Sequence, residues 1–264
     1  MRWLSIVVII CIGLNLPTHV VADLAPLQPN VIRYAFFDLP DGESMLIQTG
    51  RGEQFLFNTG SAASEEALVG YLDDFHIHHL DAIILTNQTS ETCGNTGKLM
   101  NRLSVEKLIY SGEVQQVCGE VPRDVESDKW EHNQSYELTP GISIRVLPGM
   151  KEEEMSLFIQ YGYTSLLYMA TGDVKAEQRM MDSYPLKAEL LKVGDYASTQ
   201  SPTLPLLDTI DPHLAIIYDV KGKEVNEGLM ARFQESWIDV YQLKEVGTMV
   251  IQCTPDEYEI LKTD

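Results

Sequence analysis

Basic residues are scarce in this chain of 264 residues. There are 19 Lys and Arg against 39 Asp and Glu, and the formal net charge is −20. Proteins that bind nucleic acid neutralise its phosphates with Lys and Arg. The negative electrostatic field of this chain therefore opposes DNA binding. Solubility alone accounts for most acidic surfaces, and we expect nucleic acid not to be a partner.

The motifs of two large enzyme classes are also missing. No G-x-S-x-G occurs, and neither Ser61 nor Ser198 has a histidine beside it in the sequence. Residues 94–98 (G-N-T-G-K) lack the glycine spacing of a phosphate-binding loop. The sequence therefore does not predict serine-hydrolase or P-loop chemistry.

Cysteine is sparse too, with four residues and no C-x-x-C. Cys11 lies in the N-terminal apolar run, which leaves Cys93, Cys118 and Cys253. An odd number allows at most one disulfide and one free thiol, and Cys93 with Cys118 is the candidate pair. The alternative is three unpaired thiols. Cys93 has no histidine partner in the sequence, so we expect it to be structural rather than a reactive thiol.

The N-terminus has the pattern of a signal peptide. Arg2 precedes an apolar stretch over residues 3–16, Pro17 ends it, and V-V-A precedes a predicted cut after residue 22. The apolar stretch is short for a membrane span. We therefore predict an exported protein, periplasmic or secreted, with one domain over residues 23–264 and no membrane span after cleavage; the alternative is anchoring by an uncleaved segment.

Apolar alternation and turn residues predict an α/β protein, although periodicity alone does not choose among α/β layouts. Residues 113–135 are polar and acidic and suggest a helix-and-loop excursion or a partly mobile segment. Helices are expected at 64–75, 96–103, 175–183, 201–210 and 228–235. Strands are expected at 31–38, 44–48, 54–57, 82–85, 105–110, 143–147, 156–161, 165–169, 190–193 and 214–219, with two more within 237–253.

A buried strand over residues 82–85 runs into a loop of short polar residues, T-N-Q-T-S-E-T-C-G-N at 86–95. Open α/β sheets bind ligands at the carboxyl ends of such strands. This loop resembles the metal loop T-H-x-H-x-D-H-x-G-G of the metallo-β-lactamase fold.

Other stretches match the same superfamily in order, and the resemblance is to the soluble domain of ComEC-type DNA-uptake proteins. Residues 37–44 (F-D-L-P-D-G-E-S) are similar to F-D-V-G-Q-G-D-A, and 56–60 (L-F-N-T-G) to a strand ending I-D-T-G. Residues 80–86 fit L-D-x-x-I-L-T, 167–173 resemble L-L-T-G-D, and 191–198 (L-K-V-G-D-Y-A-S) resemble L-K-V-x-H-H-G-S. The resemblance implies a four-layer αββα sandwich.

The resemblance also implies a metal-dependent hydrolase whose ligands are changed here. Asn87, Thr89 and Thr92 stand at histidine positions, and Glu91 stands at the aspartate. Amides and hydroxyls are poor zinc ligands beside imidazole. The T-G-D aspartate is kept as Asp173, Asp195 or Tyr196 replaces the later histidine, and Asn58 replaces the I-D-T-G aspartate. We therefore expect no metal and no catalytic residues: a pseudoenzyme that binds a protein or a small molecule.

Two alternatives stay open. Glu91, Asp173 and Asp195 could form an all-oxygen site for one divalent cation such as calcium or magnesium, which would make the protein a divalent-cation-dependent hydrolase. His76, His78 and His79 form a cluster, but they precede the central strand and so lie at the wrong end of it for the metal loop. For these histidines we expect a solvated connector.

Overall fold

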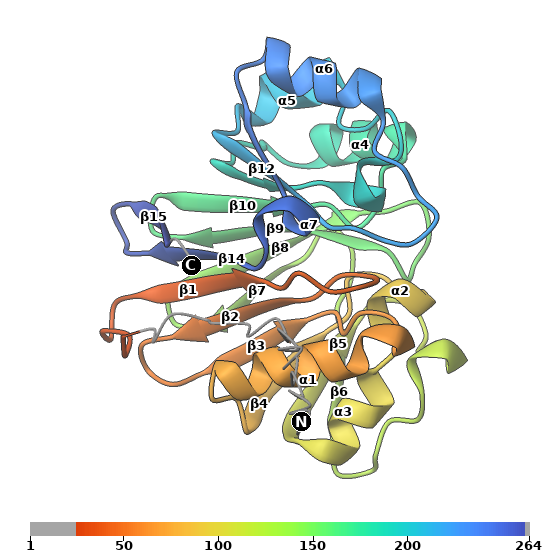
Figure 1. Cartoon of the computed structure of the whole chain (residues 1–264), viewed down its shortest axis with the longest axis vertical. Coiled ribbons are helices and arrows are strands. Elements are labelled where there is room, and N and C mark those ends of the chain that lie inside the picture. Colours follow the sequence, from red (N-terminus) through yellow and green to blue (C-terminus); the bar gives the residue numbers. More distant parts are fainter. Residues whose placement is uncertain (1–24, 262–264) are drawn as a thin grey trace, which may run out of the picture.

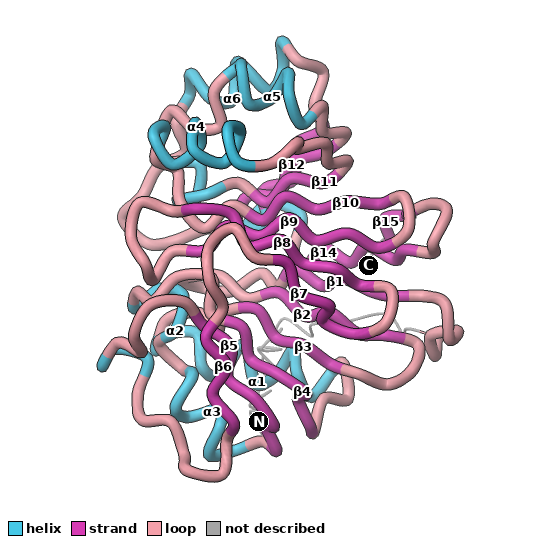
Figure 2. The backbone as a smooth tube through the Cα atoms, turned by 180° about the vertical axis from the view of Figure 1, so that it is seen from behind, coloured by secondary structure: helices cyan, strands magenta, loops and turns pink. Residues whose placement is uncertain are grey.

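The computed structural model describes residues 25–261 and contains two mixed β-sheets stacked face to face. Helices cover both outer faces, which gives four layers (Figure 1). The view from behind shows the same order, with helices at both ends and strands between them (Figure 2). The predicted signal peptide lies outside the described residues. Within those residues, no helix combines the length and the apolarity needed to cross a membrane.

The first sheet has eight strands in the order β15-β14-β1-β2-β3-β4-β5-β6. Strands β3 to β6 run parallel to one another, and the others pair antiparallel. Its strands are β1 (Ile32–Phe36), β2 (Met45–Thr49), β3 (Gln54–Phe57), β4 (His79–Ile84), β5 (Ser104–Tyr110), β6 (Glu126–Lys129), β14 (Met249–Cys253) and β15 (Tyr258–Leu261).

The second sheet has seven strands in the order β13-β12-β11-β10-β9-β8-β7. Strands β10 to β13 are parallel, and β7 to β10 form an antiparallel meander. Its strands are β7 (Ser135–Thr139), β8 (Ile142–Pro148), β9 (Met155–Tyr161), β10 (Thr164–Tyr168), β11 (Leu190–Lys192), β12 (Leu214–Ile217) and β13 (Asp239–Gln242).

Three apolar cores separate the four layers, one between the sheets and one under each helical layer. Strand β1 contributes to two of them by alternation: Tyr34 and Phe36 enter the core between the sheets, and Ala35 packs under the helices. The first sheet is covered by α1 (Glu65–Asp74) and α3 (Thr96–Arg102), and the second by α4 (Val174–Ser183), α5 (Leu204–Ile210) and α6 (Glu227–Glu235). Two short helices, α2 (Ser90–Cys93) and α7 (Leu243–Val246), lie in loops.

The predicted fold class is confirmed, and most predicted elements lie within a few residues of the observed ones. The expected excursion at 113–135 was wrong in one respect, because it contains β6, which extends the first sheet. Three of the four β6 side chains are exposed, as suits an edge strand, so apolar alternation gave no signal. The helix expected at 201–210 begins at Leu204, because Ser201 and Thr203 instead donate hydrogen bonds to the buried carboxylate of Glu177.

The candidate disulfide is confirmed: Cys93 and Cys118 are bonded, and they join α2 to the segment that follows β5. Cys253 is a free, buried thiol in β14.

Cys253 should resist alkylation in the native protein. Burial raises the pKa of this thiol to about 12, so almost none is thiolate at pH 8. For the chain without residues 1–22, and so without Cys11, we expect iodoacetamide at pH 8 to label no cysteine in the folded protein and one in the urea-unfolded protein, as counted by mass spectrometry. Fast labelling without denaturant would contradict this structure of β14.

Candidate functional site

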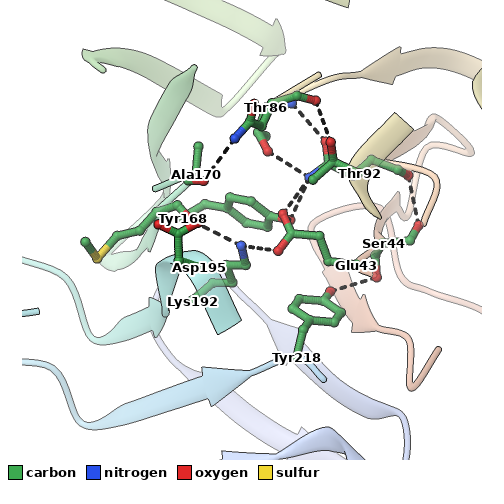
Figure 3. Close-up of polar contacts among 12 residues, drawn as sticks. Glu43, Ser44, Thr86, Thr92, Tyr168, Ala170, Lys192, Asp195 and Tyr218 are labelled. Atoms are coloured by element: carbon green, nitrogen blue, oxygen red, sulfur yellow. Dashed lines mark hydrogen bonds and ion pairs between the residues drawn. The ribbon is translucent and has the colours of Figure 1, made fainter. Parts of the chain in front are cut away.

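The carboxyl ends of strands from both sheets meet at one end of the sandwich (Figure 3). Asn58 follows β3 and Thr86 follows β4 in the first sheet, while Tyr168 ends β10, Lys192 ends β11 and Tyr218 follows β12 in the second. These strands are parallel within each sheet, so their ends lie at one edge. The polar residues predicted after the central strand therefore lie at the same end of the sandwich as Tyr168, Lys192 and Tyr218 of the second sheet, and we call this end the cleft end.

A buried ion pair lies at the cleft end, and we call it and the polar side chains around it the floor. Lys192 and Glu43 are 1% and 3% exposed, and the lysine ammonium contacts the Glu43 carboxylate directly. The ammonium also donates to the carbonyl of Met169 at 3.1 Å and lies 4.5 Å from the ring centroid of Tyr168. Charges this deep are tolerated only when paired and hydrogen-bonded, and both conditions hold here.

Asn58 joins the ion pair to the end of the central strand. Its Nδ2 lies 2.8 Å from Glu43 Oε1, 2.7 Å from Thr86 Oγ1 and 3.1 Å from the hydroxyl of Tyr168. Its Oδ1 accepts from the backbone N–H of Thr86 at 2.9 Å. An aspartate at position 58 would have no proton to donate and would place a second carboxylate against Glu43. The amide therefore suits this floor better than the acid of the resembled motif.

Two tyrosines complete the floor from the second sheet. The Tyr168 hydroxyl donates to Glu43 Oε1 at 3.1 Å, and the Tyr218 hydroxyl donates to the carbonyl of Ser44 at 2.7 Å. Burial raises the pKa of both phenols, and the charge of Glu43 raises it further. Both tyrosines are therefore neutral hydrogen-bond donors in the folded protein.

The side chains at the predicted metal-loop positions form hydrogen bonds within the loop itself. Thr89 and Thr92 form a capping box that starts α2, and the Thr92 hydroxyl also donates to the carbonyl of Asn87 at 2.8 Å. Asn87 Oδ1 accepts from the backbone N–H of Gln88 at 2.8 Å, and its Nδ2 lies 3.5 Å from the carbonyl of Ala170. These side chains act as turn and cap residues.

The three predicted cleft acids are bound separately. Asp173 is exposed and caps α4 by accepting from the backbone N–H groups of Lys175 and Ala176. Asp195 accepts from the backbone N–H of Gly172 at 2.7 Å. Burial tends to raise the pKa of Glu91, but hydrogen bonds from Ser90 and from the backbone outweigh it and the pKa is lowered.

The alternative of one divalent cation held by Glu91, Asp173 and Asp195 is therefore not supported. Over residues 25–261, a single set of three or more metal-ligating side chains has its ligand atoms within 4.8 Å, and it lies elsewhere, at His79, Asp81 and Glu106. The residues at the cleft also do not fit a zinc ion, because they offer amides, hydroxyls and separated carboxylates without an imidazole.

A left-handed turn carries Asp195 and Tyr196 into the cleft. Asp195, Tyr196 and Ala197 have φ of 47°, 59° and 56°. This is the left-handed backbone conformation, which residues other than glycine rarely adopt. Tyr196 is 7% exposed. Burial raises the pKa of its phenol, and the carboxylates of Glu43 and Glu91 raise it further. The neutral phenol of Tyr196 is thus buried near the carboxylates of Glu43 and Glu91.

Sequence reasoning missed Glu43 and Lys192 as partners, although a signal was present. Glu43 stands at the acid of F-D-V-G-Q-G-D-A, and Lys192 stands at the lysine of L-K-V-x-H-H-G-S. Both residues keep the charge of the motif position that they occupy, which is the signal that predicts them.

The sequence matches no protein-family model, and no curated protein matches it significantly. Solved structures do match. The metallo-β-lactamase fold protein YhfI of Bacillus subtilis has a TM-score of 0.62 at 12% identity, covering 84% of this chain and 100% of its own. Igni18, a metallo hydrolase of Ignicoccus hospitalis, gives 0.54 at 12% identity, covering 88% and 100%. Zn²⁺-bound PqqB of Methylobacterium extorquens gives 0.53 at 12% identity, covering 79% and 85%. This chain therefore has the metallo-β-lactamase fold.

Proposed function

We propose that this chain is an exported protein of the metallo-β-lactamase fold that has lost metal-dependent hydrolysis and acts by binding. The single observation that carries the proposal is the engagement of the loop side chains. Thr89 and Thr92 cap α2, and Asn87 holds the backbone of the loop. Donor groups committed to the turn are not free to hold a metal ion.

The charge balance of the cleft supports the same conclusion. A metal-dependent site gathers carboxylates that the ion then neutralises. Here the buried carboxylate of Glu43 is neutralised by the ammonium of Lys192, and Asp173 points into the N-terminus of α4. The charge of the Glu43 carboxylate is therefore balanced without an added cation.

Neutral hydrogen-bonding groups and a few charges at the rim remain to bind a ligand. Asp195 and Lys223 are partly exposed and face each other with Oδ1 and Nζ 3.9 Å apart, and the Lys223 ammonium lies 4.8 Å from the ring centroid of the buried Tyr196. Such a surface suits a small polar molecule or a protein segment. The resemblance to ComEC-type proteins invites a DNA-related role, but the net charge of −20 opposes it.

The disulfide is consistent with export. Disulfides persist in oxidising compartments and are rare in the cytosol. The bond between Cys93 and Cys118 supports the signal-peptide interpretation of the N-terminus. The mass of the N-terminal peptide of the exported protein would distinguish cleavage after residue 22 from an uncleaved anchor.

The test is to rebuild the metal loop. A variant carrying N87H, T89H, E91D and T92H should gain zinc affinity by at least about 100-fold over its parent, because imidazole and carboxylate replace amide and hydroxyl donors. Both proteins should also carry H79A, so that the cluster at His79 does not contribute. Zinc titration by calorimetry measures the gain, and circular dichroism checks the fold.

Two results would contradict the proposal. One is tightly held zinc, manganese or iron in the H79A parent by elemental analysis. The other is hydrolysis of phosphodiester or ester substrates with added divalent ions that is lost in D173A while the fold is kept. The second result would favour the divalent-cation-dependent hydrolase instead.

A further inference from the structure

A second group of candidate ligands lies at the start of the central strand, at the opposite end of β4 from the cleft. His79 and Asp81 belong to β4, and Glu106 belongs to the neighbouring parallel strand β5. One ligand atom from each lies within 4.8 Å of the other two. We propose that this triad is a binding site for a divalent transition metal ion, independent of the cleft.

The distances suit a shared ion better than direct pairing. His79 Nε2 lies 3.8 Å from Asp81 Oδ1 and 3.6 Å from Glu106 Oε1, both longer than a hydrogen bond. Two ligands held at about 2.1 Å from a tetrahedral zinc ion are about 3.4 Å apart. The two distances from His79 therefore exceed this value by only a few tenths of an ångström, and the third, between Asp81 and Glu106, is at most 4.8 Å.

The triad is held on rigid elements. Its three residues come from two hydrogen-bonded strands in the interior of the eight-stranded sheet, not from loops. The other carboxylate oxygen of Asp81, Oδ2, accepts from the backbone N–H of Gln54 on β3 at 2.6 Å. This bond fixes the carboxylate and leaves Oδ1 facing His79. Outer partners of this kind orient ligands in metal sites.

The two carboxylates have no basic counterion. Among the described residues, no lysine or arginine forms an ion pair with Asp81 or Glu106, and His79 is the only ion-pair partner of each. Lys107, the nearest lysine in sequence, pairs instead with Glu126 and Asp128. The negative charge at this point is therefore uncompensated, which favours a bound cation.

A cavity of about 340 Å³ adjoins the triad and is lined by both of its carboxylates. Its wall also carries the acids Glu53, Asp128 and Glu137, with Lys107 as its one lysine. The cavity leaves room for water or a further ligand on the metal. It also concentrates cations by its negative field.

The donor set indicates the class of metal. One imidazole nitrogen with two carboxylate oxygens suits zinc, copper(II) or nickel(II), whereas calcium and magnesium prefer all-oxygen sites. The site is partly exposed, with the His79 side chain 40% and the Glu106 side chain 67% accessible. We therefore expect reversible binding and not a permanently held structural ion.

The test is titration of the full exported chain with zinc and, separately, with copper(II). Because outer partners alone are worth about 10–100-fold in affinity, losing a direct ligand through H79A or D81N should weaken zinc binding by at least about 100-fold. H78A is the matched control, since His78 is the exposed neighbour, and it should change affinity less than twofold. The copper(II) EPR spectrum should show one imidazole nitrogen, lost in H79A.

The outcomes separate the two proposals. Zinc binding that disappears in H79A and D81N but survives H78A supports the triad. No binding of zinc or copper(II), or equal losses in H78A and H79A, overturns it. Zinc that persists unchanged in an H79A/D81N double variant overturns it too, and if that zinc is then lost in D173N it places the ion in the cleft, against the function proposed above.

Discussion

Replacing Lys192 by methionine should lower the free energy of unfolding by about 3–5 kcal/mol, because it leaves the carboxylate of Glu43 buried without its counterion. Both side chains are almost fully buried, and the ammonium also supports the carbonyl of Met169. Urea denaturation followed by circular dichroism measures the change. Methionine keeps most of the volume of the lysine stem, so a cavity contributes little.

The double variant E43Q/K192M is the decisive comparison. Removing both charges should recover much of the loss, because replacing a whole buried pair with neutral groups is often nearly neutral. K187M is the matched surface control: Lys187 and Asp211 are 75% and 79% exposed, so it should change stability by less than about 0.5 kcal/mol. A loss in K192M no larger than in K187M would mean that the pair does not hold the floor together.

Removing the disulfide should have the second largest effect. Cys93 and Cys118 are 25 residues apart. Closing a loop of this length lowers the conformational entropy of the unfolded chain, which corresponds to a stabilisation of about 3.5 kcal/mol. We expect C93S/C118S to lose about 2–4 kcal/mol by urea denaturation under non-reducing conditions.

Reduction provides the internal control. Dithiothreitol should lower the stability of the native protein to that of C93S/C118S and leave the variant unchanged. C253S keeps the disulfide and should still respond to the reductant. A native protein equally stable with and without dithiothreitol, once reduction is verified by mass spectrometry, would contradict the prediction.

Much of the fold could be predicted because its motifs are local and ordered along the chain. The buried run before Thr86, the N-T-G at residues 58–60 and the T-G-D ending at Asp173 each combine a strand with the loop that follows. The strands that were missed, β6, β7 and β15, all lie at sheet edges. β6 and β15 have no fully buried side chain and lack the clear alternation of a half-buried strand, whereas the short β7 (S-Y-E-L-T) alternates but has only Thr139 fully buried.

The candidate site was predictable only where its residues are neighbours in sequence. The polar loop was found, whereas the pairing of Glu43 with Lys192 joins the turn after β1 to the end of β11. The triad was missed for the same reason. His79 was considered with the neighbouring histidines His76 and His78, but its partners are Asp81 along the strand and Glu106 on the next strand.

The ammonium of Lys192 has a consequence for how the protein matures. Its positive charge is part of the polypeptide, so the cleft end of the sandwich can assemble as soon as the two sheets meet. We therefore expect this step to need no ion from the surrounding fluid. We expect a chain built in this way to complete its folding in a medium from which chelators have removed every free metal.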